Sequence, residues 1–114
     1  MHEYGLVETL LARVEEIARE RSAASVEKVH VRIGDLSGVE PALFRAAYET
    51  FRERTICAKA ELVILGAPPA WECPRCHRAI ESGALLRCCE VPARLVSGDE
   101  LTLERVEMAV PDSA

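Results

Sequence analysis

The sequence has no long apolar run, and this absence argues against a membrane-spanning protein. None of its windows reaches the length of about 20 consecutive apolar residues that a membrane-spanning helix needs. The chain begins Met-His-Glu and continues into an amphipathic pattern, without the basic flank and apolar core of a signal peptide. We therefore expect a cytoplasmic protein. In that reducing compartment its five cysteines are expected to be metal ligands, reactive thiols or packing residues rather than disulfides.

Basic residues are also scarce. The 14 Lys and Arg residues stand against 19 Asp and Glu residues, which gives a formal net charge of −5. Because a phosphate backbone requires a basic surface, nucleic acid is excluded as the expected partner. Hydrophobic residues make up 49% of the 114 residues and charged residues 29%, which is typical of a folded globular domain. We expect one hydrophobic core, with at most a small appendage.

The sequence also lacks the pattern of a zinc deaminase. Those enzymes carry a His-x-Glu sequence followed by Pro-Cys-x-x-Cys, together with an open position on the metal. Here His2 and Glu3 are adjacent, and the proline lies between the two cysteines of the motif. No general base stands beside an open metal position, so we expect a binding protein rather than an enzyme.

The spacing of apolar residues predicts two helices. Over residues 5–21 apolar side chains recur at intervals of three and four, as in a helix with one buried face. Pro41 suits the first turn of a second helix, because its missing N–H has no intrahelical acceptor there. That helix is expected to run to about residue 54, with Leu43 and Phe51 among the residues of its apolar face.

Three strands are expected from alternating or short apolar runs. The first covers residues 26–33, where apolar and polar side chains alternate, and the second covers residues 62–65. A third strand is expected after Asp99. Its alternation changes phase partway along, and a β-bulge near Glu104 and Arg105 would reconcile the two halves.

The order of these elements predicts an α/β fold. We expect a three-stranded sheet with two helices on one face, plus a small inserted zinc-ribbon-like module. The sheet and helices are assigned to residues 1–70 and 98–114, and the module to residues 71–97, which contain four of the five cysteines. The fifth, Cys57, lies between apolar neighbours and is expected to be a small packing residue.

The four clustered cysteines suggest a zinc site. Cys73 and Cys76 form a Cys-x-x-Cys motif, and Cys88 and Cys89 follow about a dozen residues later, a span typical of small zinc ribbons. Two residues between thiols suit a tight turn that directs both sulfurs at one tetrahedral Zn²⁺. Four thiolates would close the site and leave no position for a catalytic water, so the metal would be structural.

The second pair is less regular than the first. Adjacent residues of an extended backbone point to opposite sides, so Cys88 and Cys89 cannot both reach one ion without a local change of direction. Either the backbone is kinked and both bind, or His77 or Glu90 replaces one of them. Because four cysteines already suffice, we expect His77 to lie on the surface.

The first three residues offer a different kind of metal chemistry. A histidine at position two means little by itself, since chain ends are commonly polar. However, the α-amine of Met1 and the amide and imidazole nitrogens of His2 can chelate a single ion. The amide of Glu3 could supply the fourth nitrogen of a square-planar site, a geometry that suits Ni²⁺ or Cu²⁺.

Five short motifs, spread over nearly the full length, carry a family resemblance. They are Met1-His2-Glu3, Ile33–Pro41 (IGDLSGVEP), Ala60-Glu61-Leu62, Cys73-Pro74-Arg75-Cys76 and Gly98-Asp99-Glu100-Leu101. In this order they resemble the HypA/HybF family of hydrogenase-maturation nickel chaperones. The resemblance implies a nickel domain formed by both ends of the chain and a zinc domain inserted between them.

The resemblance also implies ligands and partners. On the family pattern His2 is the essential ligand of a transferable Ni²⁺ at the site of Met1, His2 and Glu3, and the four clustered cysteines hold a structural Zn²⁺. The implied partners are a nickel-insertion GTPase and the hydrogenase large subunit, with urease accessory proteins in some cases. The alternative is a zinc-ribbon protein-interaction module without nickel, in which His2 is incidental.

One feature departs from the family pattern. The second cysteine pair of the family is normally another Cys-x-x-Cys, whereas here Cys88 and Cys89 are adjacent and Pro92 stands three residues after Cys89. The sequence therefore does not decide which residues of this second pair bind the zinc ion.

Overall fold

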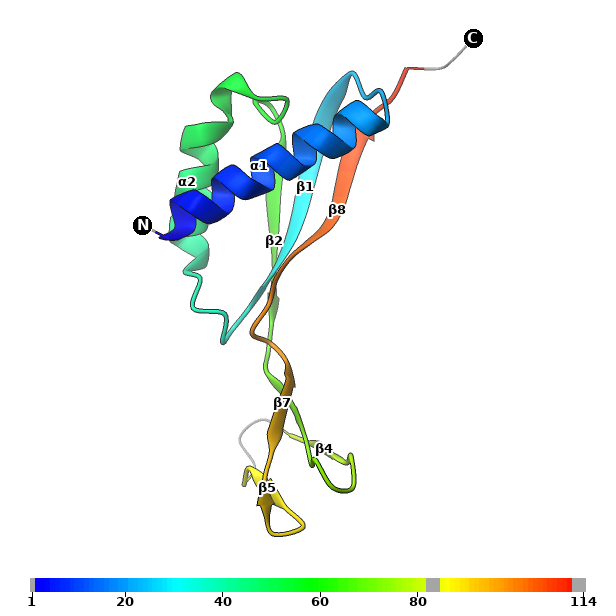
Figure 1. Ribbon diagram of the computed structural model, residues 1–114. Coiled ribbons are helices and arrows are strands. Elements are labelled where there is room, and N and C mark those ends of the chain that lie inside the picture. Colours follow the sequence, from blue (N-terminus) through cyan, green and yellow to red (C-terminus); the bar gives the residue numbers. More distant parts are fainter. Residues whose placement is uncertain (1, 82–84, 112–114) are drawn as a thin grey trace.

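The computed structural model describes residues 2–81 and 85–111. Met1, which is expected to provide the α-amine of the nickel site, lies outside the described residues. The molecule is elongated, with extents of 60 × 36 × 17 Å, and the helices gather at one end of its long axis (Figure 1). Within the described residues, no helix is long and apolar enough to span a membrane.

The described part of the chain alternates helices and strands before a series of short strands. In chain order, the elements are α1 (His2–Glu20), β1 (Ser25–Gly34), α2 (Pro41–Phe51), the 3-10 turn η1 (Arg52–Arg54), β2 (Glu61–Ala67), β3 (Ala70–Glu72), β4 (Ala79–Ile80), β5 (Arg87–Cys88), β6 (Val91–Pro92), β7 (Arg94–Ser97) and β8 (Leu101–Ala109).

The main sheet has the strand order β2-β1-β8. Strand β1 pairs in parallel with β2 and antiparallel with β8. Parallel neighbours need a crossover connection, and α2 provides it between β1 and β2. Both helices cover one face of this sheet (Figure 1). The predicted fold, a three-stranded sheet with two helices on one face and a small insertion before the last strand, is confirmed.

The expected bulge is present in β8. The pairing passes from His30 opposite Arg105 to Val31 opposite Leu103, which leaves Glu104 as the extra residue. An extra residue in one strand shifts the alternation of its side chains by one position. The apolar residues on both sides of the bulge therefore face the same hydrophobic core.

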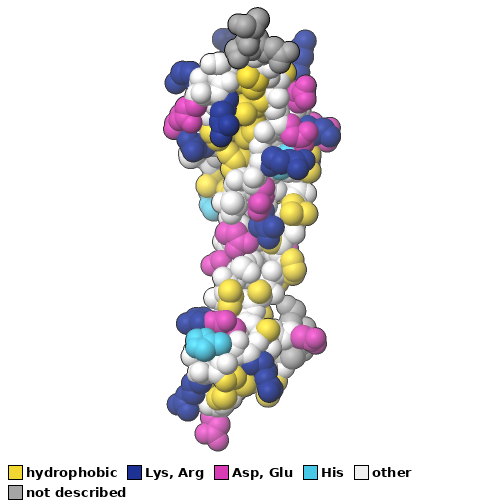
Figure 2. All heavy atoms as spheres, turned by 90° about the vertical axis from the view of Figure 1, so that its right-hand side faces the viewer, with side chains coloured by type: hydrophobic (Ala, Val, Ile, Leu, Met, Phe, Trp, Pro, Cys, Tyr) yellow, Lys and Arg dark blue, Asp and Glu magenta, His cyan; other side chains and the backbone are white. Residues whose placement is uncertain are grey.

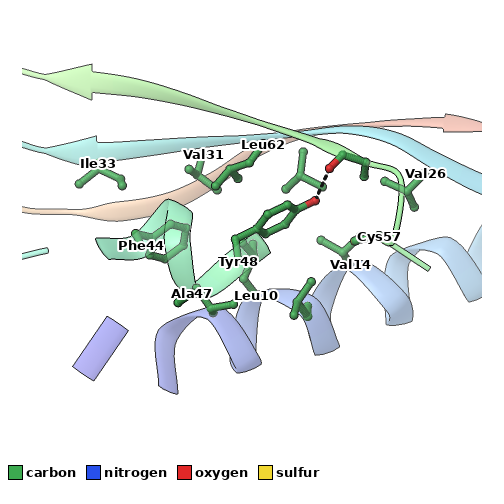
Figure 3. Close-up of a cluster of buried hydrophobic side chains, with 14 of the residues drawn as sticks. Leu10, Val14, Val26, Val31, Ile33, Phe44, Ala47, Tyr48, Cys57 and Leu62 are labelled. Carbon is green, nitrogen blue, oxygen red and sulfur yellow. Dashed lines mark hydrogen bonds between the residues drawn. The ribbon is translucent and has the colours of Figure 1, made fainter. Parts of the chain in front are cut away.

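The core lies between the sheet and the helices, and Figure 3 shows its central side chains. Phe44 and Tyr48 of α2 are fully buried, and the Tyr48 hydroxyl donates to the carbonyl oxygen of Ala60 at 2.9 Å. Burial raises the pKa of Tyr48, so the phenol stays protonated and keeps this hydrogen bond. Cys57 is also fully buried here, which confirms its role as a packing residue.

Two details of the helices differ from expectation. Helix α1 begins at His2 rather than near residue 5. Leu43 and Phe51 of α2, expected on the buried face, are 57% and 39% exposed. The Phe51 ring instead packs edge-on against Tyr4 of α1, with ring centroids 5.3 Å apart. This added contact gives the first turn of α1 a packing partner, and helices in proteins owe most of their stability to such packing.

The small insertion extends the molecule away from the helices. Strands β3, β4 and β7 form an antiparallel sheet of order β4-β3-β7, and β5 pairs with β6 in a hairpin. Figure 1 places this extension, described for residues 70–81 and 85–97, at the end of the molecule opposite the two helices. It contains the four clustered cysteines.

Backbones approach closely where the extension joins the main sheet, at a waist formed by Gly34, Pro69 and Gly98. The N–H of Gly34 donates to the Glu100 carbonyl and the N–H of Leu36 to the Gly98 carbonyl. A Cβ atom on Gly34 would lie 2.2 Å from the Gly98 oxygen. A Cβ on Gly98, which has a φ of +108°, would lie 2.5 Å from the Pro69 Cα. Both positions therefore require glycine.

Gly34→Ala should lower the free energy of unfolding by about 2–3 kcal/mol, because the added methyl group meets backbone atoms that cannot rotate away. Gly66→Ala is the matched control, since a Cβ there meets no atom within 4 Å. Its effect should stay within about 0.5 kcal/mol. Urea denaturation followed by circular dichroism measures both. Equal stability of the two variants would contradict the close approach at the waist.

Candidate metal centre

The structure brings the four predicted cysteines into one cluster. The sulfur atoms of Cys73, Cys76, Cys88 and Cys89 all lie within 4.8 Å of one another. The Cys76 and Cys88 sulfurs are 3.7 Å apart, and the Cys88 and Cys89 sulfurs are 3.8 Å apart. Two short loops of the extension, distant in the sequence, therefore converge on a single point.

The spacing of these sulfurs matches the requirement of a tetrahedral thiolate site. With metal–sulfur bonds of about 2.3 Å, the sulfurs of a tetrahedral Zn²⁺ site are about 3.8 Å apart. The two short distances in the cluster already have this value. The donor set consists of soft thiols alone, the chemistry that selects zinc over hard cations such as Mg²⁺. The residues present therefore fit a structural zinc ion.

The first cysteine pair lies in a tight turn after β3. The N–H of His77 donates to the carbonyl of Cys73 at 2.8 Å, and the N–H of Arg75 approaches the Cys73 sulfur at 3.4 Å. Backbone N–H groups of Cys76 and Arg75 lower the pKa of the Cys73 thiol, because they stabilise its thiolate. Cys73 is also fully buried, so it forms the inner corner of the cluster.

The second pair converges because the backbone turns back between the two cysteines and β6. Cys88 pairs with Val91 across the β5–β6 hairpin, and the two residues between them, Cys89 and Glu90, have φ angles of 53° and 63°. Positive φ at both central residues defines a type I′ turn, which suits a two-residue hairpin. In this turn Cys89 is not extended, so its sulfur and that of Cys88 reach the same cluster.

Close packing of the thiols disfavours their simultaneous ionisation. The neighbouring side chains of Cys76 and then Cys73 raise the pKa of Cys88 to about 12. A hydrogen bond with Cys88 lowers the pKa of Cys89, but interactions with Cys73 and Cys76 raise it, and the net effect is a raised pKa. Four thiolates at these distances require a cation to balance their charge. Binding of a divalent metal would therefore release protons from the cluster.

Neither of the two alternative ligands joins the cluster. The His77 side chain is 69% exposed, and its Nδ1 lies 3.8 Å from Glu72, a carboxylate that also pairs with Arg94. Glu90 occupies the turn itself. In residues 2–81 and 85–111, the group of side chains with metal-ligand spacing consists of the four cysteines alone. His77 lies on the surface, as expected.

The candidate nickel ligands lie at the start of α1, in the half of the molecule that contains the helices (Figure 1). His2 is exposed at the first turn of α1, and Glu3 follows it. The first four N–H groups of a helix have no intrahelical acceptor, so the amides of His2 and Glu3 are not part of the helical ladder. The structure does not bring these residues near the cysteine cluster, and the two candidate sites share no ligand.

A contact at this end was not expected from the sequence. The N–H of Glu40 donates to Oε2 of Glu3 at 3.3 Å, which joins the start of α1 to the residue before α2. Backbone hydrogen bonds from Glu3 itself and from Glu40 lower the pKa of the Glu3 carboxyl. The signal in the sequence is weak, since an acidic residue in the first turn of a helix is common for electrostatic reasons alone.

The main sheet, the helices and the four-cysteine cluster define the class of this molecule: an α/β protein with a zinc-ribbon-like extension. The family described as "Hydrogenase/urease nickel incorporation, metallochaperone, hypA" matches residues 1–108. The chain belongs to this HypA family, as the resemblance of its motifs predicted.

Relatives of similar length support this assignment. The hydrogenase maturation factor HypA of Aquifex aeolicus (strain VF5) is 39% identical over 114 residues, which cover 96% of this chain and 99% of the relative. The HypA of Wolinella succinogenes is 38% identical over 117 residues and covers 98% of each chain. The solution structure of the Ni metallochaperone HypA from Helicobacter pylori has a TM-score of 0.75 at 33% identity, over 96% of this chain and 98% of that one. A second solution structure, of HypA protein, has a TM-score of 0.81, also at 33% identity, over 97% and 98%.

The type I′ turn predicts opposite effects of two substitutions at Glu90. Glu90→Gly should preserve or tighten metal binding, because glycine adopts positive φ without steric cost. Glu90→Val should bind about tenfold more weakly than Glu90→Gly, because a side chain with a Cβ pays about 1–2 kcal/mol in this conformation and glycine does not. Titration with Co²⁺, monitored by its thiolate absorption, measures both affinities. Equal affinities for the two variants would mean that Cys88 and Cys89 converge by another route.

Proposed function

We propose that this protein binds Ni²⁺ at its N-terminus and delivers it during maturation of [NiFe]-hydrogenase. Its action is binding and transfer rather than catalysis. The observation that carries this proposal is the membership in a family of nickel-incorporation metallochaperones over residues 1–108, together with an exposed His2 at position two. The four-cysteine cluster is the structural zinc site of the same protein.

The nickel site consists of nitrogen donors from consecutive residues. The α-amine of Met1, the amide and imidazole of His2, and the amide of Glu3 surround the ion in a square plane, the geometry Ni²⁺ prefers with such ligands. The Glu3 carboxylate is engaged by the N–H of Glu40, so its part is to hold the first turn in place. Exposure of His2 leaves the ion accessible to a receiving protein.

This ligand set also explains how nickel is released. Amide nitrogens bind the metal only after losing a proton, so protons compete directly with the ion. Binding must therefore weaken as the pH falls. A receiving site that offers sulfur or nitrogen ligands of higher affinity can then take the ion from an accessible chain end without rearranging the hydrophobic core.

Zinc gives the extension the stability that its small size does not provide. We assign the zinc module to residues 71–97 and the nickel domain to residues 1–70 and 98–114. Every residue of the buried core cluster belongs to the nickel domain. Among the described residues of 71–97, Cys73 is the one buried residue, and the others are half-buried or exposed. A segment without an apolar core depends on its metal for folding, as in other small zinc modules.

The proposal includes the setting and the partners. Reduced thiols at the zinc site are consistent with a reducing cytoplasm. A nickel-insertion GTPase and the hydrogenase large subunit are the proposed partners. The relative from Helicobacter pylori (strain ATCC 700392 / 26695), 35% identical over 114 residues, is named a hydrogenase/urease maturation factor. We therefore propose urease accessory proteins as a second destination for the nickel.

The competing function is a zinc-ribbon protein-interaction module that carries no nickel. The cysteine cluster and the extension support both functions equally, since each needs the same folded zinc module. They differ only at the N-terminus. A nickel titration of the protein with its native first residue separates them.

The zinc proposal predicts about one zinc ion per chain in reduced protein, released by a thiol-reactive mercurial. Cys73→Ala or Cys76→Ala should abolish zinc retention and unfold the extension while the helices remain, because the core lies elsewhere. Cys57→Ala is the matched control, since Cys57 is buried in the core and outside the cluster. Elemental analysis and NMR spectra measure these outcomes. Stoichiometric zinc in the Cys73 variant would place the site elsewhere.

The nickel proposal predicts that tight binding requires both His2 and a free α-amine. His2→Gln, or a few residues added before Met1, should each weaken nickel binding by more than about 100-fold, because loss of a direct ligand costs more than loss of its supporting contacts. His77→Gln should leave nickel affinity unchanged. Calorimetry and the visible absorption of square-planar nickel provide the measurements.

The same variants contain their own controls. Zinc content and the unfolding midpoint should be unchanged in His2→Gln, since His2 is exposed and outside the core. If His2→Gln binds nickel as tightly as the native protein, nickel is not held at the N-terminus. The interaction module without nickel would then be the better account.

A further inference from the structure

A groove runs between α1 and the free edge of β8. Its volume is about 460 Å³, and it is lined on one side by Arg13, Ile17 and Arg21 and on the other by residues 103–106 and 108. In the strand order β2-β1-β8, strand β8 lies at an edge of the main sheet. Figure 2 looks at this side of the molecule and shows apolar side chains gathered in a strip, with Lys and Arg side chains beside it.

The floor of the groove is apolar and partly exposed. Leu103, Val106 and Met108 of β8 are only half-buried, although they lie beside the core, and Ile17 of α1 lies opposite them. These half-exposed apolar side chains lie in a row beside a strand edge that pairs with no other described strand. Together they provide both parts of a strand-docking surface. The edge offers backbone hydrogen bonds, and the side chains offer a contact area.

The charge around the floor is basic, opposite to the charge of the whole chain. Arg13, Arg21 and Arg105 line the groove together with Glu104, and the carboxylates of Glu16 and Glu107 pair with Arg13 and Arg105. The chain as a whole has a formal net charge of −5. The Glu104 carboxylate is already paired with Arg32 at 2.5 Å. The positive charge left without a paired carboxylate among the described residues is that of Arg21, and it favours an acidic partner.

The arginines differ in how they are held. Arg13 pairs with Glu16 at 2.7 Å, and Arg105 pairs with Glu107 at 2.9 Å. Both pairs are exposed, and exposed pairs contribute little and exchange partners readily. Among the described residues, the side chain of Arg21 has no carboxylate partner. Arg21 is therefore the most available of the three for a carboxylate from another molecule.

We propose that an extended, acidic segment of a partner protein docks in this groove and adds to β8 as a fourth strand of the sheet. The apolar floor accepts a small apolar side chain near the middle of that segment. Arg13 and Arg21 hold carboxylates on either side of it. This surface lies apart from both His2 and the cysteine cluster, so docking leaves the two candidate metal sites uncovered.

The spacing of the arginines defines the pattern that the partner must present. Arg13, Ile17 and Arg21 follow one another at intervals of four residues, and the hydrogen bond from the Arg21 N–H to the Ile17 carbonyl continues the helical geometry. Eight residues of helix span about 12 Å. An extended strand covers that length in about four residues at about 3.4 Å each, and residues four apart share one face. The segment should therefore carry carboxylates at positions i and i+4, with an apolar residue at i+2.

The test uses a synthetic peptide with this pattern, acetyl-Thr-Glu-Thr-Val-Thr-Glu-Thr-amide. Its sequence is palindromic, so it fits β8 in either strand direction. The control peptide, acetyl-Thr-Glu-Thr-Val-Glu-Thr-Thr-amide, has the same composition but places its two carboxylates on opposite faces of a strand. Each peptide is titrated into the full-length protein, and the amide chemical shifts of the protein give the affinity and locate the peptide on the surface.

Two charge reversals provide the protein side of the test. Arg21→Glu should weaken binding of the patterned peptide by about tenfold, because it replaces an attractive contact with a repulsive one. Arg54→Glu is the matched control, since Arg54 is exposed in η1 and does not line this groove. It alters the net charge by the same amount and should change the affinity by less than about twofold. The control peptide should bind at least about fivefold more weakly than the patterned one.

Each other result would overturn the proposal. Failure of the patterned peptide to bind at millimolar concentration would exclude the groove as a strand-docking site. Equal binding of the two peptides, or equal effects of the two charge reversals, would reduce the interaction to unspecific charge attraction. Shifted amide signals away from β8 and α1 would place the peptide elsewhere. A native protein that sediments as a dimer with β8 inaccessible to the peptide would mean that a second copy covers the groove.

Discussion

Strand β1 hydrogen-bonds to β2 on one edge and to β8 on the other, and these two ladders join parts of the chain that are far apart in sequence. The helices pack on the same face of the sheet, over the apolar side chains of β1, including Val29, Val31 and Ile33. Because β8 returns to β1 after the extension, residues 71–97 can protrude without interrupting the core. The helices, the extension and the groove beside β8 are all positioned by this one strand.

The segment that carries the IGDLSGVEP motif connects the end of β1 to the start of α2. It begins at Ile33 in the core and passes through Gly34, where the backbone of Gly98 leaves no space for a side chain. It ends at Glu40 and Pro41, where the N–H of Glu40 contacts the carboxylate of Glu3 beside His2. Close backbone packing at Gly34 and the contact of Glu40 with α1 are structural reasons for the residue types of this motif. Neither reason depends on a metal.

The two candidate metal sites use opposite strategies. The cysteine cluster draws its thiols from two loops that the fold of the extension must bring together, so metal binding there would be linked to folding. The proposed nickel site draws its nitrogens from three consecutive residues, and it needs little from the tertiary structure beyond an accessible chain end. Such a division suits a protein that keeps one ion permanently and passes another on. Figure 1 shows the start of α1 beside the main sheet and away from the extension, so the thiols lie apart from the proposed nickel site.

The sequence by itself determined the elements and most of their order, because apolar periodicity is a local property that reports which face of each element is buried. It also predicted the bulge at Glu104, since a change of phase within one strand requires an extra residue in that strand. Only the tertiary structure decided how Cys88 and Cys89 converge, because positive φ at Cys89 and Glu90 arises from the pairing of β5 with β6 and has no glycine to signal it. The exposure of Leu43 and Phe51, the contact of Glu3 with Glu40 and the groove beside β8 were likewise decided by how α1 crosses its neighbours. Such contacts depend on residues distant in the chain, which no local pattern encodes.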